Sequence, residues 1–152
     1  PKTSAGLLMF RTTPSGLEFL LAHPGGPMWK NHDAGIWTIP KGELHVSEDP
    51  LEAAKREFTE ETGIQPQGPF TPLPAITQKS GKRVMAWAFR GDCDTSRIQS
   101  NTCSVEWPPH SGKLIQVPEV DRAEFFDYAT ACLKINPAQI PFLDAVRALS
   151  QP

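Results

Sequence analysis

The sequence has no apolar run that could cross a membrane and no excess of charge of either sign. A membrane-spanning helix needs roughly 20 consecutive apolar residues, and no segment approaches that length. The chain has 15 Lys and Arg against 17 Asp and Glu, a formal net charge of −2, which indicates neither a nucleic-acid-binding nor a membrane-binding surface. No signal peptide pattern is present at the start. We therefore expect a cytoplasmic protein without a membrane or nucleic-acid partner.

Cysteine is scarce, and the three that are present do not form a metal-binding pattern. Cys93, Cys103 and Cys132 are odd in number and lack the close pairs typical of zinc sites. We interpret them as reduced thiols of a cytosolic protein. With 152 residues and 39% hydrophobic content, the chain is long enough for one domain with its own core. We predict a single domain over residues 1–152.

A glutamate-rich segment, residues 42–64, carries most of the functional signal. Glu57, Glu60 and Glu61 stand at positions i, i+3 and i+4, which places their carboxylates on one face of a helix. Like charges at this spacing destabilise a helix, so we interpret them as ligands of a hard cation such as Mg²⁺ or Mn²⁺. An EF-hand calcium site would instead distribute its acidic residues along a loop.

The same segment carries signals for both ends of a helix. Asp49 is suited to the N-cap position, and Gly63 stands where a left-handed residue would end the helix. Leu51, Ala54 and Phe58 recur at helical spacing and form an apolar stripe. The pattern therefore predicts a helix that packs by one face and presents carboxylates on another.

This segment matches the signature of the Nudix hydrolases, G-x(5)-E-x(7)-R-E-U-x-E-E-x-G-U, where U is a bulky apolar residue. The nine specified positions are filled without departure by Gly42, Glu48, Arg56, Glu57, Phe58, Glu60, Glu61, Gly63 and Ile64. From average residue usage, such a match has a chance of roughly 10⁻⁹ to 10⁻¹⁰. The chain therefore resembles a Nudix hydrolase. The resemblance implies an α+β fold, the α/β/α sandwich in which a mixed β-sheet is flanked by helices.

Short apolar runs on both sides of the helix predict the strands of this sheet. Residues 4–11 and 17–23 are separated by turn residues and predict a hairpin. Residues 65–74 are rich in proline and predict a turn. Residues 75–78 and 83–90 then predict two strands, the second apolar on both faces and therefore buried on both sides.

The C-terminal part predicts two helices, and the segment before it is the least readable. One short helix follows Asp127, a suitable N-cap, and a last helix begins near Asn136 and Pro137. Pro141 falls within the first turns of that helix, so its true start could be later. Residues 91–118 predict no clear element. Long connections of this kind often decide substrate choice.

The resemblance assigns roles to residues of the signature and to the residue before it. In this family the residue just before the first glycine provides a carbonyl ligand to the metal, and here that residue is Lys41. Glu57, Glu60 and Glu61 would hold Mg²⁺ or Mn²⁺, and Arg56 would orient the carboxylate of Glu57. These assignments follow from the family and not from spacing alone.

A further glutamate outside the signature is also implied. Several Nudix enzymes place one six residues before an aromatic residue at the start of the following strand. Glu119 and Phe125 have this relation, with Asp121 as the alternative acid. Either Glu57 or Glu119 would act as the general base that takes a proton from water.

Four residues are candidates for substrate binding. Trp29 would stack on a nucleobase, or alternatively cover an edge of the core. Lys41, Lys82 and Arg83 would neutralise a polyphosphate, although basic turn residues are often simply solvated. Trp107 is a further candidate for a base contact, with packing inside its loop as the alternative.

These features predict a metal-dependent hydrolase that cleaves a phosphoanhydride bond in a nucleotide. The Pro40-Lys41-Gly42 approach to the signature resembles the diadenosine tetraphosphate hydrolase branch, so the first candidate reaction releases ATP and AMP from that dinucleotide. A nucleoside triphosphate pyrophosphatase that removes oxidised nucleotides is the first alternative. A catalytically silent nucleotide-binding domain is the second, although such domains generally lose signature carboxylates that this chain retains. The sequence does not indicate an oligomeric state.

Overall fold

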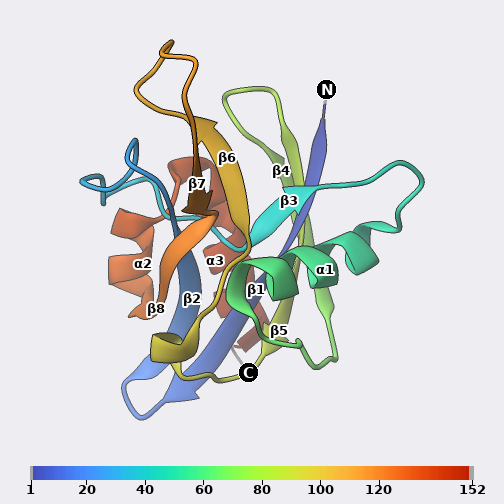
Figure 1. Ribbon diagram of the computed structural model, residues 1–152. Coiled ribbons are helices and arrows are strands. Elements are labelled where there is room, and N and C mark those ends of the chain that lie inside the picture. Colours follow the sequence, from blue (N-terminus) through green and yellow to red (C-terminus); the bar gives the residue numbers. More distant parts are fainter. Residues whose placement is uncertain (1, 151–152) are drawn as a thin grey trace.

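A mixed six-stranded β-sheet forms the centre of the computed structural model, which describes residues 2–150 (Figure 1). Its strands are β1 (Thr3–Thr13), β2 (Gly16–Pro24), β3 (Lys41–Glu43), β4 (Thr71–Thr77), β5 (Arg83–Arg90) and β8 (Val120–Asp127). The main path runs β4-β5-β1-β2-β8, and β3 pairs with the beginning of β1. Only β1 and β5 are parallel among these pairs in residues 2–150. The predicted hairpin is thus confirmed as β1–β2.

Helices cover both faces of the sheet (Figure 1). The helices are α1 (Pro50–Thr62), α2 (Tyr128–Lys134) and α3 (Ile140–Ser150), with two short 3₁₀ turns, η1 (Thr95–Arg97) and η2 (Pro137–Gln139). One buried cluster joins the sheet to α1, and another joins the opposite face to α2 and α3. The predicted α/β/α arrangement is therefore confirmed.

The strand β1 is buried on both sides because successive side chains point to opposite faces. Leu7 and Met9 belong to the cluster that contains Phe58 of α1, whereas Leu8 belongs to the cluster that contains Phe142 of α3. All five side chains are at most 2% exposed. This two-sided burial explains why the strand is a nearly continuous apolar run.

The helix α1 begins and ends where the sequence predicts. The side chain of Asp49 accepts a hydrogen bond from the backbone N–H of Glu52 at 3.2 Å, which satisfies one of the free donors of the first turn. Gly63 has φ of 76° and donates its N–H to the carbonyl of Thr59 at 2.8 Å. Ala54 and Phe58 are fully buried, so the apolar stripe faces the sheet as expected.

Two boundaries differ from the sequence-based expectation. The predicted turn over residues 65–74 is wrong from Thr71 onward, because β4 starts there and includes Pro72 and Pro74. The strand lies at the edge of the sheet, where a proline need not donate to a neighbouring strand. The last helix begins at Ile140, after η2, and this later start agrees with the position of Pro141.

The segment 91–118, for which no element was predicted, contains a separate hairpin. Its strands are β6 (Thr102–Glu106) and β7 (Leu114–Pro118), and they project beyond the end of the sheet (Figure 1). At the base, the N–H of Asn101 donates to the carbonyl of Glu60 at 2.8 Å, and the N–H of Glu119 donates to the carbonyl of Asn101 at 2.9 Å. This hairpin therefore joins the end of α1 to the residue that precedes β8.

Two further properties of residues 2–150 concern membrane-spanning helices and the state of the cysteines. No helix within residues 2–150 is long and apolar enough to cross a membrane. Cys93, Cys103 and Cys132 are free thiols, each partly buried. Burial raises the pKa of the Cys93 and Cys103 thiols, which favours their protonated form.

Gln139 connects η2 to the segment that leads into β3. Its buried side chain accepts a hydrogen bond from the N–H of Ile39 at 3.0 Å and donates to Oε1 of Gln78 at 3.1 Å. Gln139→Leu would leave the Ile39 N–H buried without this partner, so we expect the free energy of unfolding to fall by about 1–3 kcal/mol. Urea denaturation measures this, with exposed Gln67→Leu as the control. Equal stability of Gln139→Leu and the wild type would contradict the prediction.

Candidate functional site

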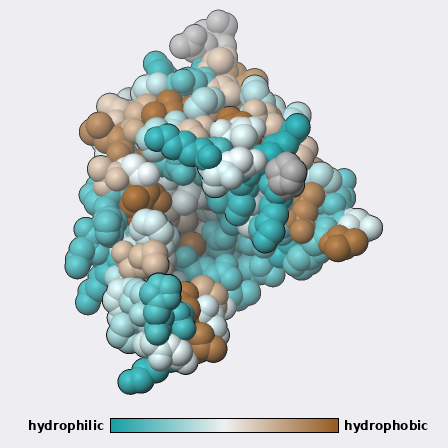
Figure 2. Space-filling view, turned by 90° about the horizontal axis from the view of Figure 1, so that it is seen from above, coloured by the Kyte–Doolittle hydropathy of each residue, from teal (hydrophilic) through white to brown (hydrophobic). Residues whose placement is uncertain are grey.

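Three glutamates from distant parts of the chain converge beside β3. Glu57 and Glu61 lie on α1 and Glu119 lies between β7 and β8, and one carboxylate oxygen of each lies within 4.8 Å of the other two. Glu57 and Glu61 are each only 8% exposed. We call these three residues the acidic cluster. Seen from above, the surface is hollowed near its centre, with both hydrophilic and hydrophobic residues around the hollow (Figure 2).

The pKa values of the cluster reflect burial and mutual repulsion. Burial raises the pKa of Glu57 and of Glu119. Burial, followed by the charges of Glu57 and Glu119, raises the pKa of Glu61 well above its ordinary value. The charge of Lys41 and a hydrogen bond from its backbone act in the opposite direction. Three carboxylates this close together, two of them buried, form a set of oxygen donors suited to a hard divalent cation.

Arg56 holds several of the signature acids in place. Its Nε and Nη2 donate to the two oxygens of Glu48 at 2.8 and 3.0 Å, a bidentate pair. Its Nη1 donates to Oε1 of Glu57 at 2.8 Å. The guanidinium therefore connects Glu48 to the acidic cluster and restricts the orientation of the Glu57 carboxylate.

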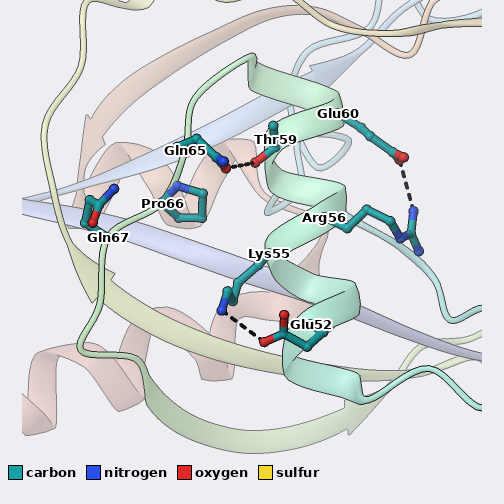
Figure 3. A pocket seen from close by; sticks show the side chains of 8 residues that line it. All are labelled: Glu52, Lys55, Arg56, Thr59, Glu60, Gln65, Pro66 and Gln67. Atoms are coloured by element: carbon teal, nitrogen blue, oxygen red, sulfur yellow. Dashed lines mark hydrogen bonds and ion pairs between the residues drawn. The ribbon is translucent and has the colours of Figure 1, made fainter.

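Glu60, a predicted metal ligand, is not one of the three converging carboxylates. Its Oε2 accepts a hydrogen bond from Arg56 at 3.1 Å, on the outward side of α1 (Figure 3). Its side chain is 34% exposed. The charge of Glu60 still contributes, after burial and Glu57, to the raised pKa of Glu119, so it lies at the border of the cluster. Its role as a ligand stays a prediction.

The pairing of Glu48 with Arg56 leads to a prediction about acid stability. Hydrogen bonds from Arg56, and then from the backbone of His45, lower the pKa of Glu48 from 4.5 to about 2. A lowered folded-state pKa means that ionised Glu48 stabilises the fold above pH 4.5, and that this contribution is lost as the pH falls towards about 2. We expect Glu48→Gln to be less stable than the wild type at neutral pH and less sensitive to acid over that window. Urea midpoints at a series of pH values measure this, with exposed Glu52→Gln as control. Parallel wild-type and Glu48→Gln curves would contradict it.

The strand β3 passes so close to α1 that only glycine fits at one position. A Cβ atom on Gly42 would lie 2.1 Å from Cδ of Glu57. The preceding residue, Lys41, has a backbone hydrogen bond to the Glu61 carboxylate. The backbone of β3 is thus one wall of the acidic cluster. The predicted coordination by the Lys41 carbonyl stays a prediction.

The predicted basic residues lie at different distances from the cluster. Burial, and then the like charge of Lys82, lower the pKa of Lys41, while Glu61 and Glu57 act to raise it. Nζ of Lys82 lies 3.8 Å from Oε2 of Glu43. These two lysines therefore lie beside the acidic cluster. Arg83 is exposed at the start of β5, and its substrate role stays a prediction.

Trp29 lies in the loop between β2 and β3 and is 37% exposed. Its base-stacking role and the alternative, that it covers an edge of the core, both stay predictions. Its ring meets the His32 ring edge-on at 5.8 Å. Together with Trp107, it lines a small cavity between this loop and the β6–β7 hairpin.

His23 is a structural residue that sequence reasoning missed. It is 1% exposed, with Nδ1 2.8 Å from Oδ1 of Asp121 and Nε2 2.6 Å from the carbonyl oxygen of His32. The ring thereby joins the β2–β3 loop to the start of β8, two residues from Glu119. This contact engages the carboxylate of Asp121, which is the alternative to Glu119 as the acid outside the signature. No spacing signal could reveal a contact between residues 98 positions apart.

Comparisons with known proteins agree with this architecture. A family model described as the NUDIX domain matches residues 1–146. A curated RNA pyrophosphohydrolase from Rhizobium meliloti (strain 1021) is 36% identical over 105 residues, which are 59% of this chain and 58% of that protein. This chain thus aligns with little more than half of its curated relative.

Solved structures resemble the chain over almost its whole length. A C. elegans Ap4A hydrolase in a binary complex has a TM-score of 0.65 at 23% identity, covering 98% of this chain and 97% of that one. The NUDIX domain of Shewanella oneidensis NrtR, complexed with ADP ribose, has a TM-score of 0.69 at 12% identity, covering 99% and 88%. At these identities the likeness concerns the fold alone.

Proposed function

The chain belongs to the Nudix family, and from that premise we propose that residues 1–152 form one metal-dependent hydrolase domain that cleaves phosphoanhydride bonds in nucleotides. The observation that carries the proposal is the convergence of Glu57, Glu61 and Glu119 beside two lysines. Carboxylates suit a divalent cation, and lysines suit the phosphates of the substrate. A cytoplasmic location stays a prediction from composition.

The acidic cluster fits Mg²⁺ or Mn²⁺ by its chemistry. It offers only oxygen donors, and two of the three carboxylates, those of Glu57 and Glu61, are buried. Glu57, Glu61 and Glu119 would hold the ion, with Glu60 and the Lys41 carbonyl as further candidate ligands. When bound, such an ion offsets the charge of the phosphates and makes water a better nucleophile.

The side chains around the cluster then have distinct tasks. Glu57 or Glu119 accepts the proton of the attacking water, and the raised pKa of each is suited to this task. Arg56 keeps the Glu57 carboxylate oriented. Lys41, Lys82 and the more distant Arg83 bind the polyphosphate. Water attacks one phosphorus, the bridging P–O bond breaks, and two phosphorylated products leave without a covalent intermediate.

The first candidate substrate is diadenosine tetraphosphate, cleaved to ATP and AMP. The Pro40-Lys41-Gly42 approach to the signature supports it, together with the two lysines beside the cluster. The curated relative favours a second candidate, a phosphoanhydride on RNA. The net charge of −2 weighs against an extended RNA-binding surface. A nucleoside triphosphate is the third candidate.

A turnover panel with chromatographic identification of products tests these proposals. The panel contains diadenosine tetraphosphate, common and oxidised nucleoside triphosphates, ADP-ribose, a nucleotide sugar and an RNA oligonucleotide with a 5′-triphosphate, each with Mg²⁺ or Mn²⁺. Glu57→Gln is the blank. ATP plus AMP at the highest rate would support the first candidate, and pyrophosphate release from RNA or a triphosphate would replace it. Silence across the panel would contradict the hydrolase proposal and favour a nucleotide-binding domain.

A further inference from the structure

Glu119 is the residue between β7 and β8, beside a point where the sheet is irregular. The pairing of β2 with β8 changes register between His23 and Pro24, and Asp121 on β8 is passed over. Such an unpaired residue interrupts the ladder of hydrogen bonds and bends the strand that carries it. The ladder alone therefore does not fix the stretch next to Glu119, and other contacts must do so.

The His23 ring binds this stretch to the β2–β3 loop. Its Nδ1 lies 2.8 Å from Oδ1 of Asp121, and its Nε2 lies 2.6 Å from the carbonyl oxygen of His32. A carbonyl oxygen and an ionised carboxylate only accept hydrogen bonds, so a ring that bonds to both donates from both nitrogens. The ring is 1% exposed, so bulk water does not compete for either bond. His23 thus connects Asp121 to the loop across the irregular point.

Two residues after His23, the backbone of the same segment holds Glu119 directly. The N–H of Gly25 donates to the carbonyl of Glu119 at 3.0 Å. A Cβ atom built on Gly25 would lie 2.0 Å from the carbonyl oxygen of Pro118, so the two segments are in close contact. The ring of His23 and the N–H of Gly25 therefore hold the two ends of residues 119–121.

His23 is itself held by the core cluster that contains side chains of α2 and α3. Its ring meets the Trp37 ring edge-on, with the ring centroids 5.1 Å apart, and Trp37 belongs to that cluster. Nε1 of Trp37 donates to Oδ1 of Asp33 at 2.7 Å, and Asp33 forms an ion pair with Lys134 of α2. The His23 ring is therefore a fixed point to which the Asp121 side chain is bound.

The acidic cluster needs such support because its members repel one another. One carboxylate oxygen of Glu119 lies within 4.8 Å of an oxygen of Glu57 and of Glu61. Like charges at this separation repel, and this repulsion favours a chain in which residue 119 moves away from α1. Contacts outside the cluster must therefore keep the Glu119 carboxylate in place before a cation binds.

We propose that His23 is a positioning residue of this site: by binding Asp121, it holds the carboxylate of Glu119 beside Glu57 and Glu61. This inference rests on the proposed function, because it takes these carboxylates to hold a divalent cation. In this role His23 contacts neither the cation nor the substrate. Residues that orient metal ligands typically change metal affinity or activity roughly 10- to 100-fold when they are replaced, and we expect an effect of that size.

Mn²⁺ binding without substrate, measured by electron paramagnetic resonance of the free ion, tests the proposal apart from hydrolysis. The amide nitrogen of asparagine is as many bonds from the backbone as Nδ1 of His23, and that of glutamine as many as Nε2. His23→Asn can therefore keep the bond to Asp121, whereas His23→Gln can keep only the bond to the His32 carbonyl. We expect His23→Gln to weaken Mn²⁺ binding roughly 10- to 100-fold, and His23→Asn to retain most of the affinity.

A second pair of variants breaks the same contact from the side of β8. The Asp121 side chain is 33% exposed, so its replacement leaves no large cavity, and this pair serves if His23→Gln does not fold. Asp121→Ala should weaken Mn²⁺ binding as His23→Gln does. Asp121→Asn should not, because its amide oxygen can still accept the bond from Nδ1 of His23. Circular dichroism checks the fold of each variant.

A double-mutant cycle with Glu119→Gln separates positioning from a general effect on the fold. If His23 acts through Glu119, then His23→Gln should cause little further loss of Mn²⁺ affinity in Glu119→Gln protein. A full further loss in that background would overturn the proposal, as would wild-type Mn²⁺ affinity in folded His23→Gln and Asp121→Ala. Mn²⁺ binding that depends on His23, in a protein silent across the turnover panel, would support the positioning role while removing the hydrolase proposal. The two failures are therefore distinguishable.

Discussion

Glu57→Gln is expected to lower kcat by about three orders of magnitude or more while the protein stays folded. Removing a general base alone typically costs 10²–10⁴-fold, and Glu57 also contributes charge to the proposed cation site. The amide has the same shape as the carboxylate, and its carbonyl oxygen can still accept the hydrogen bond from Nη1 of Arg56. The loss therefore concerns charge and proton transfer and not packing.

The measurement is kcat with Mg²⁺ at saturating substrate, with circular dichroism as the check on folding. Glu52→Gln is the matched control, since it makes the same change on the same helix at a side chain that is 62% exposed and paired with Lys55. It should retain wild-type turnover. Normal turnover of folded Glu57→Gln would remove Glu57 from the reaction. Glu119→Gln under the same conditions shows which of the two carboxylates matters more for proton transfer.

Gly42→Ala is expected to lower kcat by about 10²-fold or more, although the added methyl group is the smallest possible side chain. The new Cβ would lie 2.1 Å from Cδ and Oε2 of Glu57, closer than atoms can approach without moving. The carboxylate would have to leave its place between Arg56 and the other two cluster residues. Misplacement by about 1 Å can cost 10²-fold in rate.

Turnover and thermal unfolding of Gly42→Ala separate this steric effect from loss of the fold. Gly81→Ala is the control, because its φ of +89° is strained for alanine but the added atom meets open space. Gly81→Ala should lose some stability and no activity. If Gly42→Ala were as active as the wild type, the close approach of β3 to Glu57 would not matter for catalysis.

Much of the fold and two of the three residues of the acidic cluster are predictable because their determinants are local. The bounds of α1 follow from Asp49 and Gly63, and the adjacency of Glu57 and Glu61 follows from the 3.6-residue period of a helix. The β1–β2 hairpin follows from two apolar runs around a turn. In contrast, whether a strand lies at the edge of a sheet depends on how all the strands pair. The sequence of β4 therefore does not reveal that its prolines lie in an edge strand, where they are tolerated.

The β6–β7 hairpin was not predicted because its strands are short and its apolar face is covered by another loop. Alternation of Cys103 and Val105 with polar residues over so few positions is a weak signal. The contacts that hold the hairpin come from Asn101 and Glu106, which bond to backbone groups. Such bonds leave no periodic pattern in the sequence.

By itself, then, the sequence determined the family, the face of α1 that carries Glu57 and Glu61, and the candidacy of Glu119. Only the tertiary structure decided that Glu119 reaches that face, that Gly42 touches Glu57, and that Trp29 lies opposite Trp107. The physical reason is the range of the forces involved. Helix periodicity and capping act over a few residues, whereas the place of Glu119 depends on sheet register, the Asn101 bonds and the His23–Asp121 contact. Those exist only once the whole chain has folded.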